Sequence, residues 1–154
     1  MLSSLLPGLA LVVASGILAL AQPAAAGEPT QVTPIHDPAL LKAFHGEAGI
    51  RRITADALQR YQHDPRIADI FKGHDLVRLE KELGDHTCWL LGGPCVYSGR
   101  NMREAHRNLG LQARDMDALV ENLQAAMDKE GVPFSAQNRL LAKLAPMKRD
   151  VVER

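Results

Sequence analysis

Apolar residues recur at helical spacing along most of this 154-residue chain. Between residues 48 and 63, for example, Ile50, Ile53, Ala57 and Tyr61 fall on one face of a helix. Glycine and proline interrupt the periodicity at intervals, and no stretch alternates apolar with polar residues as a half-buried strand does. The sequence therefore predicts an all-α domain of short helices.

The interruptions divide the chain into expected helices and turns. The segment 75–91 ends at Gly-Gly-Pro, which is a strong stop signal, and Pro146 is expected to bend the last helix because proline lacks an N–H donor. Helices are predicted at 37–44, 48–63, 75–91, 102–109, 113–129 and 135–152, with a brief turn at 67–71.

The first 27 residues carry no charged side chain, whereas all 36 charged residues and all six aromatic residues follow. Residues 5–21 are almost wholly apolar, and Ala24 and Ala26 match the small-x-small pattern for cleavage after Ala26. We expect a periplasmic or secreted protein with no stable membrane association after cleavage; an uncleaved leader that anchors the chain in a membrane is the alternative. The predicted organisation is a signal peptide at 1–26, a linker at 27–38 and a single helical domain at 39–154.

Lysine and arginine total 18, as do aspartate and glutamate, so the formal net charge is zero. A neutral chain has no overall electrostatic attraction for nucleic acid or anionic lipid. No nucleic-acid partner is therefore expected.

The two cysteines, Cys88 and Cys95, both lie after the predicted cleavage site. In an exported protein an even pair indicates a disulfide, with two free buried thiols as the alternative. In a regular helix His86 lies 200° from Cys88, which argues against a zinc site built from His86, Cys88 and Cys95.

Residues 92–106 read Gly-Gly-Pro-Cys-Val-Tyr-Ser-Gly-Arg-Asn-Met-Arg-Glu-Ala-His. From spacing alone, Met102, His106 and Leu109 share a helical face, and a histidine there is more often a core residue than a ligand. The stretch resembles the signature of group 1 truncated haemoglobins, GGP-x-x-Y-[TS]-G-x-x-M-[KR]-x-x-H, whose last histidine is the proximal haem ligand. Segments 64–71, 131–133 and 144–146 resemble the same family in register, so the resemblance covers about residues 39–152.

The resemblance implies a truncated globin-like two-over-two helical sandwich around haem b. It implies that His106 is the axial iron ligand and that Phe71 stacks on the porphyrin. The haem is expected to be held non-covalently, because the chain has no Cys-x-x-Cys-His motif. Further residues carried over are Tyr97 and Met102 at the proximal edge, and Leu119, Leu140 and Leu144 behind the haem. Arg78 and Arg100 are the candidate partners of the haem propionates, because Glu82 occupies the family's usual basic position.

The predicted distal side departs from the family. Leu58 stands where a tyrosine is usual, Leu83 where a glutamine is frequent, and Leu79 at the gate. Apolar side chains cannot donate a hydrogen bond to bound dioxygen, so weak oxygen binding is expected unless His86 or Thr87 donates instead. His86 is also the candidate for a sixth iron ligand.

The implied function is reversible binding of oxygen, nitric oxide or carbon monoxide at iron trans to His106, for oxygen binding, transport or gas scavenging. One alternative is a haem enzyme, a nitric oxide dioxygenase or peroxidase-like protein, which would need an unidentified redox partner because the chain has no nucleotide-binding motif. The other is a haem-free helical interaction domain stapled by the disulfide. The sequence leaves open whether the protein is an enzyme.

Overall fold

The computed structural model describes residues 30–153, and the predicted signal peptide and its cleavage site lie outside them. These residues form helices and contain no strand, which confirms the all-α prediction. No helix in residues 30–153 has both the length and the apolarity that crossing a membrane requires. In chain order the elements are α1 (Pro38–Ala43), α2 (Gly46–His63), η1 (Ala68–Phe71), α3 (Leu76–Leu90), α4 (Met102–His106), α5 (Ala113–Lys129), α6 (Phe134–Leu144), η2 (Ala145–Met147) and α7 (Lys148–Val151).

Polar side chains fix where several helices begin. The Asp37 carboxylate accepts from the backbone N–H of Ala39 at 2.9 Å, at the start of α1. Asp75 and Asn101 cap α3 and α4 in the same way. Each cap satisfies a backbone donor that has no partner within its own helix, so these residues set the helix starts.

Two of the expected helices are shorter in the structure. The segment predicted at 102–109 is helical only to His106, because Arg107 has an extended backbone (φ −60°, ψ 132°), and Asn108 after it is left-handed with φ of 63°. The segment predicted at 135–152 is divided by a 3₁₀ turn that contains Pro146, where the missing N–H prevents a continuous α-helix. Both differences matter for the site, because α4 and α7 are thereby short, separate elements.

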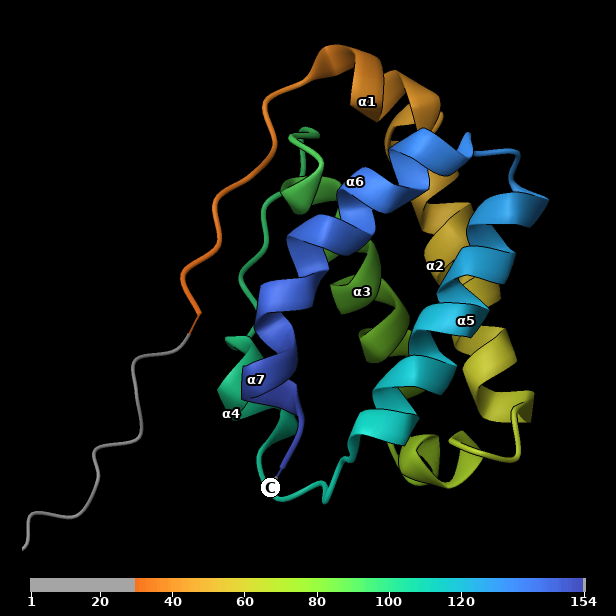
Figure 1. The fold of residues 1–154 in the computed structure, drawn as a ribbon, viewed down its shortest axis with the longest axis vertical. Helices are drawn as coiled ribbons and strands as arrows, with labels where there is room; N and C mark the ends of the chain where they lie inside the picture. Colours follow the sequence, from red (N-terminus) through yellow and green to blue (C-terminus); the bar gives the residue numbers. More distant parts are fainter. Residues whose placement is uncertain (1–29, 154) are drawn as a thin grey trace, which may run out of the picture.

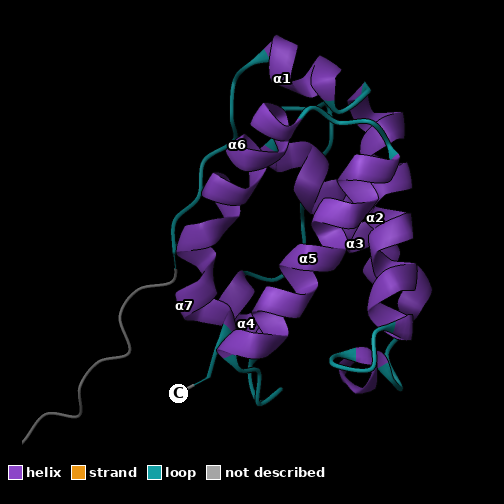
Figure 2. Cartoon of the chain, turned by 45° about the vertical axis from the view of Figure 1, so that its right-hand side comes forward, coloured by secondary structure: helices purple, strands orange, loops and turns teal. Residues whose placement is uncertain are grey.

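The helices form two antiparallel pairs, α2 with α3 and α5 with α6 (Figures 1 and 2). Helix α2 lies at the centre of the packing and contacts both α3 and α5. Its core face is fully buried, as the helical periodicity predicts, and so is Leu140 of α6. The buried residues of α2 are Gly49, Ile50, Ile53, Thr54, Ala57, Leu58 and Tyr61.

Residues 30–37, which we call the strap, precede α1 and contain no helix. The strap runs in extended form along the outside of α6 and α7 up to α1 (Figure 1). At one end the Thr30 N–H donates to Asp150 of α7 at 2.6 Å. Further along, the Ile35 N–H donates to the Leu90 carbonyl at the end of α3, at 2.7 Å. This part of the predicted linker therefore lies against the domain.

Candidate functional site

His106 is the last residue of α4, and its side chain is partly buried. Its Nδ1 atom lies 2.7 Å from the backbone carbonyl oxygen of Met102, one helical turn earlier. A carbonyl oxygen can only accept, so this contact requires the proton on Nδ1 and leaves the lone pair on Nε2. Metal-binding histidines are commonly held in this way, with one ring nitrogen donating to a carbonyl and the other free to coordinate.

The surroundings of His106 favour its neutral form. Burial lowers the pKa of the imidazole, and this outweighs the opposite effect of the Met102 carbonyl, while Arg100 lowers it further. A histidine binds a metal through a neutral nitrogen, so a lowered pKa keeps the ring ready to coordinate near neutral pH.

Helix α3 and the loop after it bring His86 and Tyr97 to the same place. The ring centroids of His86 and Tyr97 are 4.7 Å apart, and the Trp89 ring lies 6.3 Å from His86. Burial lowers the pKa of His86 to about 4, and the positive form of His106 lowers it too. The structure therefore gathers His86, Tyr97 and His106 from three different elements.

The loop between α3 and α4 is held by close polar and steric contacts. The Tyr97 hydroxyl donates to the Arg100 carbonyl oxygen at 2.7 Å, just before α4 begins. A Cβ at Gly99 would lie 2.5 Å from both the Tyr97 hydroxyl and a carboxylate oxygen of Glu82, so a larger residue there would displace one of these side chains. Tyr97 thereby connects α3 with the start of α4.

Apolar side chains from several elements accompany these polar groups. Phe71 stacks on Tyr61 with ring centroids 5.4 Å apart, and it remains partly exposed. Partly exposed apolar residues pack against the buried core at other predicted pocket positions, so they can contact a further apolar group without repacking the core. These residues are Leu79 and Leu83 of α3, Leu119 of α5 and Leu144 of α6.

The remaining predicted site residues differ in how firmly they are held. The Arg78 side chain is 71% exposed and lies 3.9 Å from Glu82, and Arg100 is also exposed. Met102 and Thr87 are partly buried, whereas Leu58 belongs to the fully buried core. Sequence reasoning missed Trp89; its spacing of three residues from His86 was the available signal, because such residues are neighbours on a helix.

Cys88 and Cys95 are joined by a disulfide in the structure. The bond connects the end of α3 to the loop that carries Tyr97, and Cys88 itself is fully buried. A Cβ at Gly93 would lie 2.6 Å from the Cys88 sulfur, so the Gly-Gly-Pro turn packs directly on the bridge.

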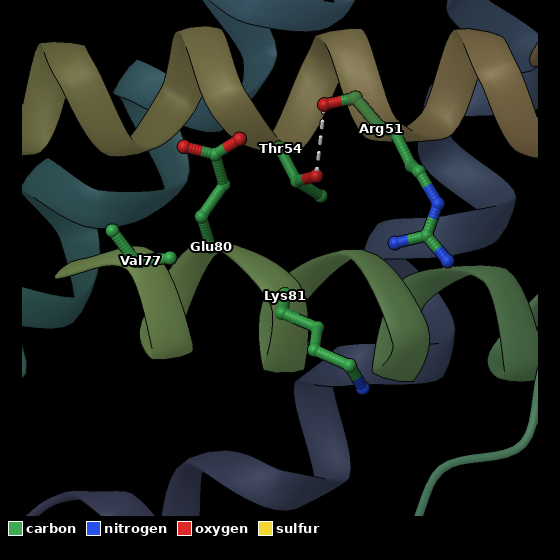
Figure 3. Close-up of a pocket in the computed structure, with 5 residues that line it drawn as sticks. All are labelled: Arg51, Thr54, Val77, Glu80 and Lys81. Carbon is green, nitrogen blue, oxygen red and sulfur yellow. Dashed lines mark hydrogen bonds between the residues drawn. The ribbon is translucent and has the colours of Figure 1, made fainter. Parts of the chain in front are cut away.

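Two surface grooves lie along the seam between α2 and α3. One has a volume of about 410 Å³ and is lined by Arg51, Thr54, Val77, Glu80 and Lys81, as Figure 3 shows. The other, of about 470 Å³, shares Val77 and Glu80 and includes Leu58 and Leu76. On α3, Val77 lies 180° around the helix from His86, so the side of α3 that both grooves share faces away from His86.

Comparison with known proteins gives consistent matches. A family model described as "Bacterial-like globin" matches residues 39–153. A "Group 1 truncated hemoglobin" of Tetrahymena pyriformis is 35% identical over 107 residues, which are 70% of this chain and 88% of that protein.

Solved structures match over a similar part of the chain. The crystal structure of truncated hemoglobin from Tetrahymena pyriformis in the Fe(III) form has a TM-score of 0.72 at 29% identity, and the match covers 75% of this chain and 98% of that one. The 2/2 hemoglobin from Synechococcus sp. PCC 7002, solved with covalently attached heme, has a TM-score of 0.69 at 23% identity with the same coverage, which is a likeness of fold.

Proposed function

Because this chain belongs to the bacterial-like globin family, and within it to the group 1 truncated haemoglobins, we propose that His106 is the axial ligand of its haem iron and that the protein reversibly binds a diatomic gas. The observation that carries the assignment of His106 is the 2.7 Å contact between its Nδ1 atom and the Met102 carbonyl. That contact leaves Nε2 of a neutral ring with a free lone pair. In globins, a histidine nitrogen of this kind is what coordinates the haem iron.

The apolar residues described at the candidate site also suit a haem. Phe71, Leu79 and Leu83 offer partly exposed apolar surface for a flat apolar ligand, while the packed core behind them stays closed. When bound, haem supplies the iron that coordinates oxygen, nitric oxide or carbon monoxide. The chain's own part is to orient the His106 ring through Met102 and to exclude water with these apolar side chains.

We propose that the gas-binding side is poor in hydrogen-bond donors. Leu58 and Leu83 occupy the positions where the family usually provides a tyrosine and a glutamine. His86 is one candidate donor, because its neutral ring carries one N–H, and the Thr87 hydroxyl is the second. A donor would prolong the residence of oxygen, so their absence at positions 58 and 83 favours weak oxygen binding and readier binding of carbon monoxide or nitric oxide.

Non-covalent attachment of haem b is part of the proposal, since the chain lacks a Cys-x-x-Cys-His motif. The covalent attachment in the Synechococcus neighbour makes this worth testing. Extraction with acidified butanone should move all of the haem into the organic layer. Haem that stays with the polypeptide would show a covalent bond and overturn this part of the proposal.

The experiment that tests His106 is a haemin titration of the haem-free protein. Wild type should develop a Soret band at one haem per chain, and His106→Gly should bind haem weakly until imidazole is added to replace the missing ring. His74→Gly, which removes an exposed histidine before α3, is the matched control and should behave as wild type. Unchanged haem binding in His106→Gly would place the ligand elsewhere.

Export is proposed from the leader at 1–26 and gains support from the pairing of Cys88 with Cys95, because such bonds persist in oxidising compartments. Expression of the full chain in a bacterial host should give a periplasmic product whose first residue is Gly27. A product that retains Met1 and pellets with membranes would favour the anchored alternative. A redox partner, if the haem is cycled, would have to be supplied by another protein.

A further inference from the structure

Helix α4 is too short to hold His106 in place by itself. It has five residues, and a single helical turn in isolation is unstable because its nucleation is unfavourable. Asn101 caps its start, with the side-chain oxygen accepting from the Glu104 N–H at 2.9 Å. The chain then leaves the helix directly after His106. The orientation of His106 therefore depends on what α4 packs against.

The partner of α4 is α7, and the two helices lie side by side in both views (Figures 1 and 2). Asp150 of α7 is at the centre of this contact, with its side chain only 1% exposed. Its Oδ1 atom accepts from Arg103 of α4, from Nη2 at 2.5 Å and from Nε at 3.1 Å. A second tie lies beyond the helix, where the Glu153 N–H donates to the Leu111 carbonyl at 2.8 Å.

The other oxygen of Asp150 binds the strap. Its Oδ2 atom accepts from the Thr30 N–H at 2.6 Å, and the Thr30 hydroxyl accepts from Nε of Arg149 at 2.8 Å. One buried carboxylate thus joins three segments that are far apart in the sequence. Burial alone would raise the pKa of Asp150, but the bonds from Thr30 and Arg103 outweigh it and lower the pKa to about 2. The group is therefore ionised at any pH at which the protein would work.

We infer that Asp150 is a positioning residue for His106: it accepts from Arg103 and Thr30 at once and so ties both α4 and the strap to α7. The inference rests on the proposed role of His106 for its functional meaning. Its structural part, the stabilisation of α4, holds or fails independently. A carboxylate suits this position because both of its oxygens accept, whereas an amide would turn an NH₂ group toward a donor.

The test is hydrogen exchange of the haem-free protein, read in peptides that cover residues 102–109. Asp150→Asn should exchange about tenfold faster there, because α4 opens locally when a buried donor loses its acceptor. Asp56→Asn is the matched control, since Asp56 of α2 pairs with Lys129 of α5 without touching α4. It should leave exchange at 102–109 unchanged. Equal exchange in Asp150→Asn and wild type would overturn the inference.

A second variant decides the matter if Asp150→Asn fails to fold. Thr30→Pro removes the strap's N–H, together with the hydroxyl that accepts from Arg149, and leaves Arg103 and Asp150 in place. It should raise exchange at 102–109 by a smaller factor, and no change in this variant would remove the strap from the inference.

The loaded protein gives a functional readout that is separate from gas binding. In the ferrous state the iron–histidine stretching band should broaden or shift in Asp150→Asn. Ferric haem should transfer to apomyoglobin several-fold faster from Asp150→Asn than from wild type or Asp56→Asn. If wild type binds no haem, the proposed function fails while the exchange result still tests the role of Asp150. If wild type binds haem and the variant matches it in both measurements, Asp150 does not position His106.

Discussion

At the scale of single residues, His86 is a largely buried histidine whose surroundings favour its neutral form. It lies against Tyr97 and Trp89, and burial, together with the positive form of His106, lowers its pKa to about 4 from 6.5. Because the folded-state pKa is below the unfolded-state value, the unfolded chain binds more protons between these two pH values. The stability that depends on a neutral His86 is therefore complete above pH 6.5 and is lost as the pH falls through about 4.

This predicts how His86→Phe will change the pH dependence of stability. Phenylalanine keeps an aromatic ring beside Tyr97 but cannot be protonated. Between pH 6.5 and 4, wild type should lose up to about 3 kcal/mol more of its free energy of unfolding than the variant does. Urea denaturation of the haem-free proteins at a series of pH values measures this. Parallel pH profiles would show that His86 titrates normally.

Residue-scale features differed in how far the sequence could predict them. The signature at 92–106 led to His106, because its residues lie close together in the chain. The contact of His106 Nδ1 with the Met102 carbonyl could have been predicted, because the two residues are four apart in a helix. The hydrogen bonds of Asp150 with Thr30 and Arg103 could not, because they join positions 120 and 47 residues apart. No local pattern indicates such a partner.

At the scale of elements, the end of α3 is tied twice, by the disulfide to the loop and by Leu90 to the strap. The sequence predicted the stop at Gly-Gly-Pro and the pairing of the cysteines. It placed the ends of the last helices less well. The predicted helix at 102–109 ends at His106 because Arg107 is extended, and Pro146, where a bend was expected, divides the predicted helix at 135–152 with a 3₁₀ turn. Helix ends depend on tertiary contacts that periodicity does not contain.

Removing the disulfide should lower stability modestly. The bond joins two cysteines that are only seven residues apart in the sequence, and closing so short a loop removes little entropy from the unfolded chain. A Cys88→Ala/Cys95→Ala variant should therefore lose about 2 kcal/mol in free energy of unfolding. Urea denaturation with and without dithiothreitol gives the measurement. The reductant should destabilise wild type by a similar amount and leave the double variant unaffected. A wild type that is insensitive to reductant under unfolding conditions would argue that the bond is not formed.

Gly92 should be essential to the contact between α3 and the strap. It has a φ of +73°, and a Cβ there would lie 2.2 Å from the Ile35 carbonyl oxygen. Gly131 is the matched control, since its φ is +78° but nothing lies within 4 Å of its Cβ position. Gly92→Ala should therefore lower the free energy of unfolding by about 1 kcal/mol or more beyond the loss in Gly131→Ala. Equal losses of free energy of unfolding in the two variants would mean that the strap can move away from position 92 at no measurable cost.

At the scale of the whole molecule, the all-α architecture was predictable because helical periodicity is a local property of the sequence. The arrangement of α2 with α3 and of α5 with α6 came from the family resemblance and agrees with the matched globin structures. The net charge of zero belongs to the part of the chain after residue 27, since no charged side chain precedes it. Such a domain exerts no overall steering on charged partners, and an uncharged gas needs none.

We propose that this domain would hold a haem through His106 and that the haem iron would then bind a diatomic gas. The most direct measurement is the absorbance spectrum of the purified mature protein, ferric and ferrous, with and without carbon monoxide. We expect a Soret band in the ferric protein, its change on reduction, and a further sharp shift when carbon monoxide is added to the ferrous form. No Soret band after purification from haem-replete cells, together with no spectral change on addition of haemin, would overturn this proposal.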